Sequence, residues 1–160
     1  MMQQIHRVRL LIIGNELLAG RRQDKHFGHC QQYFSERGLP IVSTHYCHDE
    51  IDELVSILQW LQGAGDVCFC FGGIGATPDD LTRAAAAKAF NLELVRHQEA
   101  SGLIQGQFGE QAFPIRIKMA DLPEGASLIP NEFNNIPGFT LKGLHFLPGF
   151  PQMAWPMLDW

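Results

Sequence analysis

Three short apolar runs, each followed by a segment suited to a helix, constrain the fold of this chain more than any other feature. The runs are Val8–Ile13, Leu39–Tyr46 and Asp66–Phe71; the helical segments after them are Asp24–Arg37, a segment started by Asp49 and ended by Gly63-Ala64-Gly65, and Leu81–Phe90. Continuous apolar runs are typical of strands covered on both faces. Repeated strand-then-helix units predict an open α/β sheet with right-handed crossovers.

Length and composition predict one globular domain that binds neither nucleic acid nor membrane. The chain has 160 residues, 46% of them hydrophobic, which is enough for one buried core. Its 12 Lys and Arg against 17 Asp and Glu give a net charge of −5, unlike the basic surface that nucleic acid requires. The apolar runs are far shorter than the roughly 20 residues that cross a bilayer. No secretory signal is visible, so we expect a cytoplasmic protein.

The four cysteines lack a C-x-x-C pair and are expected to be buried, reduced thiols. They are Cys30, Cys47, Cys68 and Cys70. The scattered histidines show no H-x-x-x-H or H-E-x-x-H spacing, and no G-x-S-x-G elbow is present. A zinc site and covalent catalysis are therefore not favoured.

Signals weaken after Phe90. A short helix is expected at Glu99–Phe108, and short strands are expected at Arg116–Met119, Ser127–Ile129 and Leu144–Leu147. The chain ends in the apolar segment Met153–Trp160, which must be buried against the domain, a partner or further sequence.

The sharpest candidate site is Gly72–Asp80, placed directly after a predicted buried strand. In open α/β sheets, ligands lie outside the carboxyl ends of the strands, and glycines let backbone N–H groups approach an anion. The segment therefore predicts a phosphate or nucleotide site. Two adjacent carboxylates, Asp79 and Asp80, would repel phosphate unless a divalent cation lay between them. The alternative is local capping, with Thr77 as N-cap, Pro78 as first helical residue and Asp80 in a capping-box-like pair.

Two further segments follow strands that end at the same edge. Glu16 lies in Gly14-Asn15-Glu16, and Asp49 lies in Tyr46–Glu50. Each acid has an alternative role at a helix start. Two turn-rich apolar segments, Asn131–Phe139 and Leu147–Pro151, are candidate pocket walls, or turns without further function.

Together these motifs resemble the molybdopterin-binding domain shared by molybdenum-cofactor biosynthesis proteins and the competence/damage-inducible protein A family. The segments that carry the resemblance are Gly14–Leu18, Asp49 and Gly72–Asp80. Four other segments are more similar to the N-terminal domain of the competence/damage-inducible branch: Gly20-Arg21-Arg22-Gln23-Asp24, Leu122–Ala126, Pro137-Gly138 and Leu147–Pro151. The likeness covers nearly the whole chain.

The resemblance implies a three-layer α/β/α domain with a mostly parallel sheet, formed by residues 1–160, in a homo-oligomer. It also implies metal-dependent hydrolysis of ADP-ribose-like nucleotides to AMP and ribose 5-phosphate. Asp79 and Asp80 would hold a divalent metal, magnesium or a similar ion, and Asp80, Asp49 and Glu16 would be catalytic. The expected phosphate or ligand contacts are Gly14, Asn15, Gly72, Gly73, Gly75, Thr77, Pro148 and Gly149. The partner is a small nucleotide or pterin phosphate.

Alternatives from other classes stay open. The domain could bind molybdopterin or a nucleotide without turnover, resemble a molybdenum-cofactor biosynthesis adenylyltransferase, or dock a partner through its apolar end. Two departures bear on this choice, because the Gly-Asp-Glu and Gly-Pro-Thr of the family read Gly14-Asn15-Glu16 and Gly75-Ala76-Thr77 here. The C-terminal amidase domain of longer members is absent from this sequence, so its activity is not transferred.

Overall fold

A six-stranded, mostly parallel sheet forms the centre of the computed structural model, which describes residues 7–160. The strand order is β2-β1-β3-β8-β7-β6. The parallel strands are β1 (Val8–Ile13), β2 (Ile41–Cys47), β3 (Val67–Phe71) and β8 (Leu144–Leu147). The antiparallel strands are β6 (Ser127–Ile129) and β7 (Gly138–Leu141). The prediction of a mostly parallel α/β sheet is confirmed.

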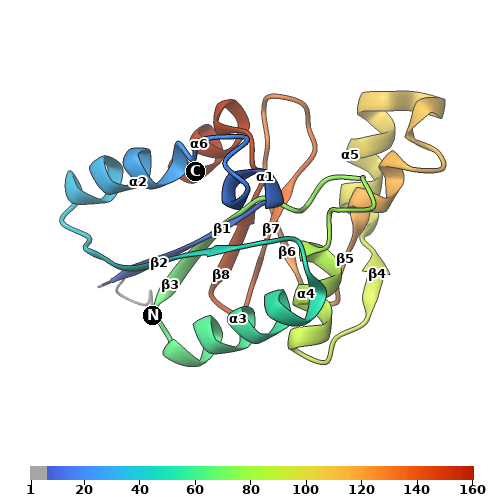
Figure 1. Ribbon diagram of the computed structural model, residues 1–160. Helices are drawn as coiled ribbons and strands as arrows, with labels where there is room; N and C mark the ends of the chain where they lie inside the picture. The colour runs from blue at the N-terminus through green and yellow to red at the C-terminus, as the bar shows by residue number, and fades with distance from the viewer. Residues whose placement is uncertain (1–6) are drawn as a thin grey trace, which may run out of the picture.

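Helices cover both faces of this sheet, which gives the three expected layers (Figure 1). Helices α2 (His26–Ser35) and α6 (Pro151–Asp159) lie on one face, and α3 (Ile51–Ala64) and α4 (Thr82–Ala89) lie on the other. The side chains of β1 explain why both faces are covered. Leu10 and Ile12 are buried in the core beneath α2 and α6, whereas Leu11 and Ile13 are buried in the core beneath α3 and α4.

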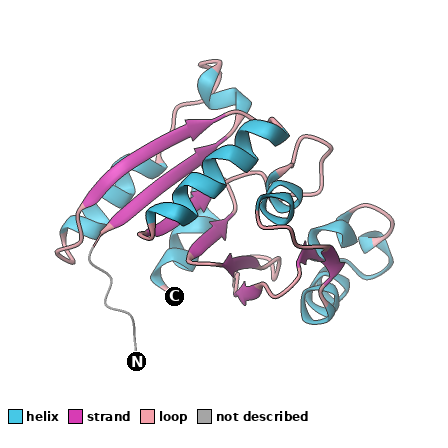
Figure 2. Cartoon of the chain, turned by 90° about the horizontal axis from the view of Figure 1, so that it is seen from below, coloured by secondary structure: helices cyan, strands magenta, loops and turns pink. Residues whose placement is uncertain are grey.

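A smaller unit lies beside the main sheet (Figure 2). It consists of the two-stranded sheet β4 (Leu94–Arg96) and β5 (Asp121–Pro123), with α5 (Gln98–Phe108) and two 3-10 helices, η1 (Gly109–Ala112) and η2 (Arg116–Ala120). Arg116–Met119 is therefore not the predicted strand. The reason is that Ile117, Met119 and Ala120 turn together into the core, while Lys118 N–H donates to the Ile115 carbonyl.

Part of the apolar end of the chain packs against the domain itself, whereas its last residue, Trp160, is 75% exposed. Met153–Trp160 is largely included in α6, and Ala154, Met157 and Leu158 are in the core beneath it. The four cysteines are free and buried, as predicted. None of the helices within residues 7–160 has the length and apolarity needed to cross a membrane.

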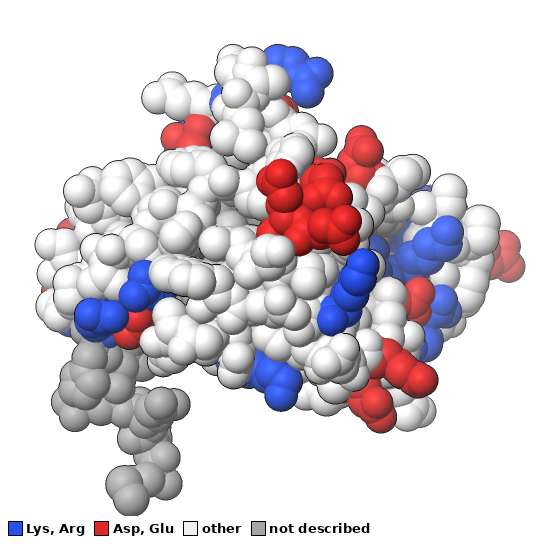
Figure 3. Space-filling view, turned by 60° about the horizontal axis from the view of Figure 1, so that its bottom comes forward, with Lys and Arg blue, Asp and Glu red and all other residues white. Residues whose placement is uncertain are grey.

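Charge is unevenly distributed over the surface. On the face shown in Figure 3, acidic side chains gather in one patch, and Lys and Arg are scattered around it. On this face, the distribution is unlike the continuous basic stripe by which proteins bind a nucleic-acid backbone.

Candidate functional site

A cavity of about 570 Å³ opens at the carboxyl ends of β1, β3 and β8, and every predicted site residue lines it. The residues come from four separate segments of the chain. They are Gly14, Asn15, Glu16, Asp49, Gly72, Gly73, Gly75, Thr77, Asp79, Asp80, Pro148 and Gly149. Because parallel strands end at one edge, residues far apart in the sequence meet there. Their position in the cavity is thus known, and their chemical roles stay predictions.

The glycines after β3 adopt backbone conformations that other residues rarely reach. Gly72 has φ +106° and Gly73 has φ +74°, and a Cβ on either would overlap a neighbouring atom. Gly72 N–H donates to the Leu147 carbonyl at 2.9 Å, and the Thr82 hydroxyl donates to the Gly72 carbonyl at 3.0 Å. The loop is therefore fixed against β8 and the start of α4.

Asp80 closes the second half of this loop. Its Oδ2 accepts hydrogen bonds from the Thr77 backbone N–H at 2.9 Å and from the Thr77 hydroxyl at 2.7 Å. The alternative in which Thr77 is the N-cap of the following helix is wrong, because α4 begins at Thr82 and its N-cap is Leu81. Both bonds engage the same carboxylate oxygen, and Gly75 fits close beside it.

Asn15 and Asp49 hold each other through reciprocal hydrogen bonds. Asn15 N–H donates to Asp49 Oδ2 at 3.2 Å, and Asp49 N–H donates to Asn15 Oδ1 at 2.9 Å. Asp49 is not the helix cap, since the Glu50 side chain accepts from the N–H groups of Asp52 and Glu53 at the start of α3. Capping by Glu50 directs Asp49 into the cavity instead. The Asn15 side chain accepts the bond from the Asp49 N–H without adding a negative charge to the cavity.

The electrostatics of the cavity disfavour ionisation of Asp49. Burial raises the pKa of its carboxyl, and the negative charges of Glu16, Asp80 and Asp79 raise it further. The Asn15 N–H bond acts in the opposite direction. A cation at this position would relieve the repulsion among these carboxylates.

Arg83 is a site-supporting residue that the sequence reasoning missed. It is 8% exposed, and its Nη2 donates to the Gly75 carbonyl at 2.9 Å. Its Nη1 donates to the backbone carbonyls of Lys118 and Asp121, so it links the loop to η2 and β5. Burial lowers the pKa of Arg83. Its position after Thr82 resembled an ordinary helix residue, so no local signal identified it.

The donor chemistry of the cavity fits a hard divalent cation. Carboxylate oxygens are the usual protein ligands of magnesium, which binds through one or two of them and keeps sites for water and phosphate. Among the described residues, no three of Glu16, Asp49, Asp79 and Asp80 have donor atoms within 4.8 Å of one another. This spacing does not suit a site in which the protein supplies all the ligands. It suits a cation that is held by one or two carboxylates and by the oxygens of a bound phosphate.

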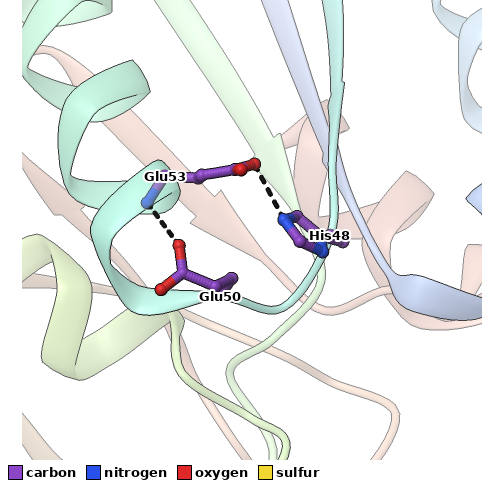
Figure 4. Close-up of side chains that lie close together, drawn as sticks. All are labelled: His48, Glu50 and Glu53. Carbon is purple, nitrogen blue, oxygen red and sulfur yellow. Dashed lines mark hydrogen bonds and ion pairs between the residues drawn. The ribbon is translucent and has the colours of Figure 1, made fainter.

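A tighter group of potential ligands lies outside the cavity, at the start of α3 (Figure 4). The donor atoms of His48, Glu50 and Glu53 all lie within 4.8 Å of one another. Glu50 accepts from the Glu53 N–H at 2.8 Å, and His48 Nε2 lies 2.8 Å from Glu53 Oε2. Capping of α3 and this side-chain pair explain the grouping without a metal.

The two turn-rich segments, Asn131–Phe139 and Leu147–Pro151, both contribute residues to the wall of the cavity, which is the first of the two roles predicted for them. Asn131 is 4% exposed, and its Nδ2 donates to Asn134 Oδ1 at 2.8 Å and to the Ile136 carbonyl at 3.0 Å. The same amide and that of Asn134 contact Met153 Sδ on α6. The other segment contributes Pro148, Gly149 and Phe150.

A buried histidine fixes the second of these walls. Trp155 Nε1–H donates to His26 Nδ1 at 3.1 Å, and His26 Nε2 lies 2.8 Å from the Gly149 carbonyl. An indole N–H only donates, so Nδ1 is the acceptor and the proton of the neutral ring resides on Nε2. Burial lowers the pKa of His26. The hydrogen bond with the Gly149 carbonyl and the charge of Asp24 oppose this effect, and Arg22 and His29 add to it.

Acidification below about pH 6.5 is expected to destabilise the fold through His26. The unfolded state binds a proton more readily than the folded state, so stability is full above the unfolded pKa and is lost as pH falls. Burial lowers the pKa of His45 and His145 as well. Urea midpoints at pH 5 should lie below those at pH 7, and His26→Gln should reduce the difference. An unchanged pH dependence in this variant would remove His26 from the explanation.

Comparison with known sequences identifies a family. Residues 9–160 match the family described as a probable molybdopterin binding domain. A protein from Caldivirga maquilingensis is 34% identical over 160 residues, covering 96% of this chain and 62% of that protein. A CinA-like protein from Syntrophus aciditrophicus is 34% identical over 152 residues, covering 91% of this chain and 36% of that protein. The chain thus spans between about a third and two thirds of these relatives.

Solved structures agree on the fold, and one of them is a CinA protein. The crystal structure of the protein CinA, of unknown function, from Thermoplasma acidophilum has a TM-score of 0.87 at 25% identity, covering 96% of this chain and 94% of that one. The molybdopterin biosynthesis enzyme MoaB from Thermus thermophilus has a TM-score of 0.59 at 21% identity, covering 97% and 88%; this likeness shows the fold alone. The chain therefore belongs to the family of probable molybdopterin-binding domains, in its CinA-like branch.

Proposed function

We propose that this domain hydrolyses ADP-ribose or a similar nucleotide, with a divalent cation, to AMP and ribose 5-phosphate. The observation that carries the proposal is the convergence, in one cavity, of a fixed glycine loop with four carboxylates. A phosphate can approach the backbone of the glycine loop closely, but the negative carboxylates repel it unless a cation is bound with it. A diphosphate ligand with a bound cation satisfies both features.

The residues divide between binding and proton transfer. Gly72, Gly73 and Gly75 would let the diphosphate approach the loop, and Asp79 and Asp80 would hold the cation. When bound, the cation would neutralise charge on the diphosphate and lower the pKa of an adjacent water. Asp49, whose pKa is raised, is suited to accept the proton of that water, with Glu16 as the other candidate. The water oxygen would bond to one phosphorus as the bridging P–O bond breaks.

Product formation from ADP-ribose by the purified protein tests this proposal. AMP release should require magnesium, manganese or cobalt and should stop when a chelator is added. ATP and NAD, assayed alongside, would define whether the diphosphate linkage or the whole nucleotide is recognised. Folded protein that releases no AMP from ADP-ribose with any of these metals would contradict the proposed hydrolysis.

Binding without turnover would favour a different class of function. The neutral Asn15, where the family has an acid, motivates this alternative of a non-catalytic molybdopterin or nucleotide binder. Thermal stabilisation by pterins or nucleotides, with no product under any metal, would support it. Transfer of an adenylyl group from ATP to molybdopterin would instead support the adenylyltransferase alternative. The assembly of the protein into a homo-oligomer stays a prediction, which can be tested on the same purified protein.

A further inference from the structure

A second cavity of about 840 Å³ lies beside the first, between α1 (Asn15–Leu18), α2 and α6. The two cavities share the part of their walls formed by Ile13, Glu16, Arg22, Gly149 and Phe150. Sequence reasoning did not predict this second space, since Trp155 and Gln152 reach it only because α6 folds back onto the sheet. Its residues have no role in the proposed hydrolysis apart from the shared wall.

The walls of the second cavity combine aromatic and polar side chains. Leu17 and Trp155 supply apolar surface, and Gln23 and Gln152 supply amide groups. Four charged side chains also line the cavity: Glu16, Arg22, Asp24 and Lys25. Phe71 is 1% exposed and lies beneath the His26 ring, with the ring centroids 4.3 Å apart, so this stack supports the wall from behind. An aromatic side chain beside amide and charged groups suits a ring system that carries polar substituents.

Arg22 stands at the boundary between the two cavities. Its Nη1 lies 3.6 Å from Glu16 Oε1, and its Cζ lies 5.4 Å from the centre of the Phe150 ring. The Arg22 side chain is 45% exposed and the Glu16 side chain is 40% exposed, so the ion pair holds the arginine only weakly. Guanidinium groups bind phosphate oxygens in pairs, and a phosphate at the boundary would compete for Arg22.

We propose that the second cavity is a ring-binding subsite, which takes the heteroaromatic half of a ligand whose phosphate lies at the boundary with the first cavity. Arg22 contacts that phosphate. One face of the Trp155 indole is stacked on His29 with ring centroids 3.8 Å apart, so the ligand ring lies against the rest of the indole. This inference rests on the proposed function, because it assigns the adenine of an ADP-ribose-like ligand to a place of its own. It makes the site selective for ring-bearing phosphates over sugar phosphates.

AMP and ribose 5-phosphate are matched probes for this subsite, since both carry a ribose phosphate and only AMP carries a ring. In calorimetric titrations of each probe in the presence of magnesium, the Kd for AMP should be at least about tenfold below that for ribose 5-phosphate, because stacking of a base on an aromatic side chain adds binding free energy of this size. AMP should also quench tryptophan emission, and ribose 5-phosphate should not. Equal affinity for the two probes would overturn the subsite.

The location is tested with two tryptophan variants. Trp155→Phe should lose the quenching by AMP, whereas Trp60→Phe, on α3 at the opposite face of the sheet, should keep it. Quenching that persists in folded Trp155→Phe would overturn this placement. If Trp155→Phe fails to fold, the affinity ratio in the wild type still decides. Absence of ADP-ribose hydrolysis together with absence of binding by either probe refutes the proposed function; hydrolysis with equal Kd values refutes the subsite alone.

Discussion

Replacing Asp80 by Asn should reduce metal-dependent AMP release from ADP-ribose by at least about 100-fold, while the fold is preserved. The amide oxygen of Asn can still accept the bonds from the Thr77 N–H and hydroxyl, which keeps the turn closed. The substitution removes the negative charge that would hold the cation beside the diphosphate. The loss should therefore appear in the rate and in the stabilisation by magnesium with AMP, both measured on the same protein.

Asp52→Asn is the matched control for this variant. Asp52 lies on α3 outside both cavities and forms an exposed pair with Lys88 at 3.4 Å. Its substitution should leave hydrolysis at the wild-type rate, because an exposed pair contributes little. An Asp80→Asn protein with a wild-type melting temperature and wild-type turnover would remove Asp80 from the proposed mechanism.

Replacing Gly72 by Ala should lower the free energy of unfolding by at least about 3 kcal/mol. Gly72 has φ +106°, and an added Cβ would overlap the Ile13 carbonyl oxygen in the neighbouring strand. The backbone cannot move away without breaking the bond between Gly72 N–H and the Leu147 carbonyl. Urea unfolding measures the change, and the loss should include the ligand-dependent stabilisation, since the loop lies in the cavity.

Gly102→Ala separates this effect from the general consequence of replacing glycine. Gly102 lies within α5, where an added Cβ meets no atom within 4 Å. Alanine should stabilise this helix by about 0.5–1 kcal/mol. If Gly72→Ala is as stable as the wild type, β1 and the loop can move apart at this point. That result would contradict the predicted overlap between the added Cβ and the Ile13 carbonyl oxygen.

Several features of the molecule were accessible from sequence because local chemistry determines them. The apolar runs Leu10–Ile13 of β1 and Val67–Phe71 of β3 are short but continuous, so they predicted buried strands, and their ends predicted where a ligand would lie. The periodicity of α3 and its terminal glycine, Gly65, determined that helix in the same way. Glu16 and Asp80 were therefore predicted at one edge of the sheet, and in the structure both line one cavity together with Asp49.

Other features depended on contacts between distant residues. Arg116–Met119 became a 3-10 helix because its apolar side chains had a core to enter and no strand to pair with. Whether the apolar end would cover this domain or another protein was decided only when α6 packed against β1 and α2.

The sequence by itself determined three parallel strands, β1, β2 and β3, the helices that follow them and the edge at which the acids gather. Each follows from hydrophobic periodicity and from the direction of parallel strands. Only the tertiary structure decided that Asn15 holds Asp49, that Arg83 fixes the loop, and that α6 encloses a second cavity. Each of these depends on groups 8 or more positions apart in the chain, and hydrogen bonds and burial between such groups exist only once the layers are packed.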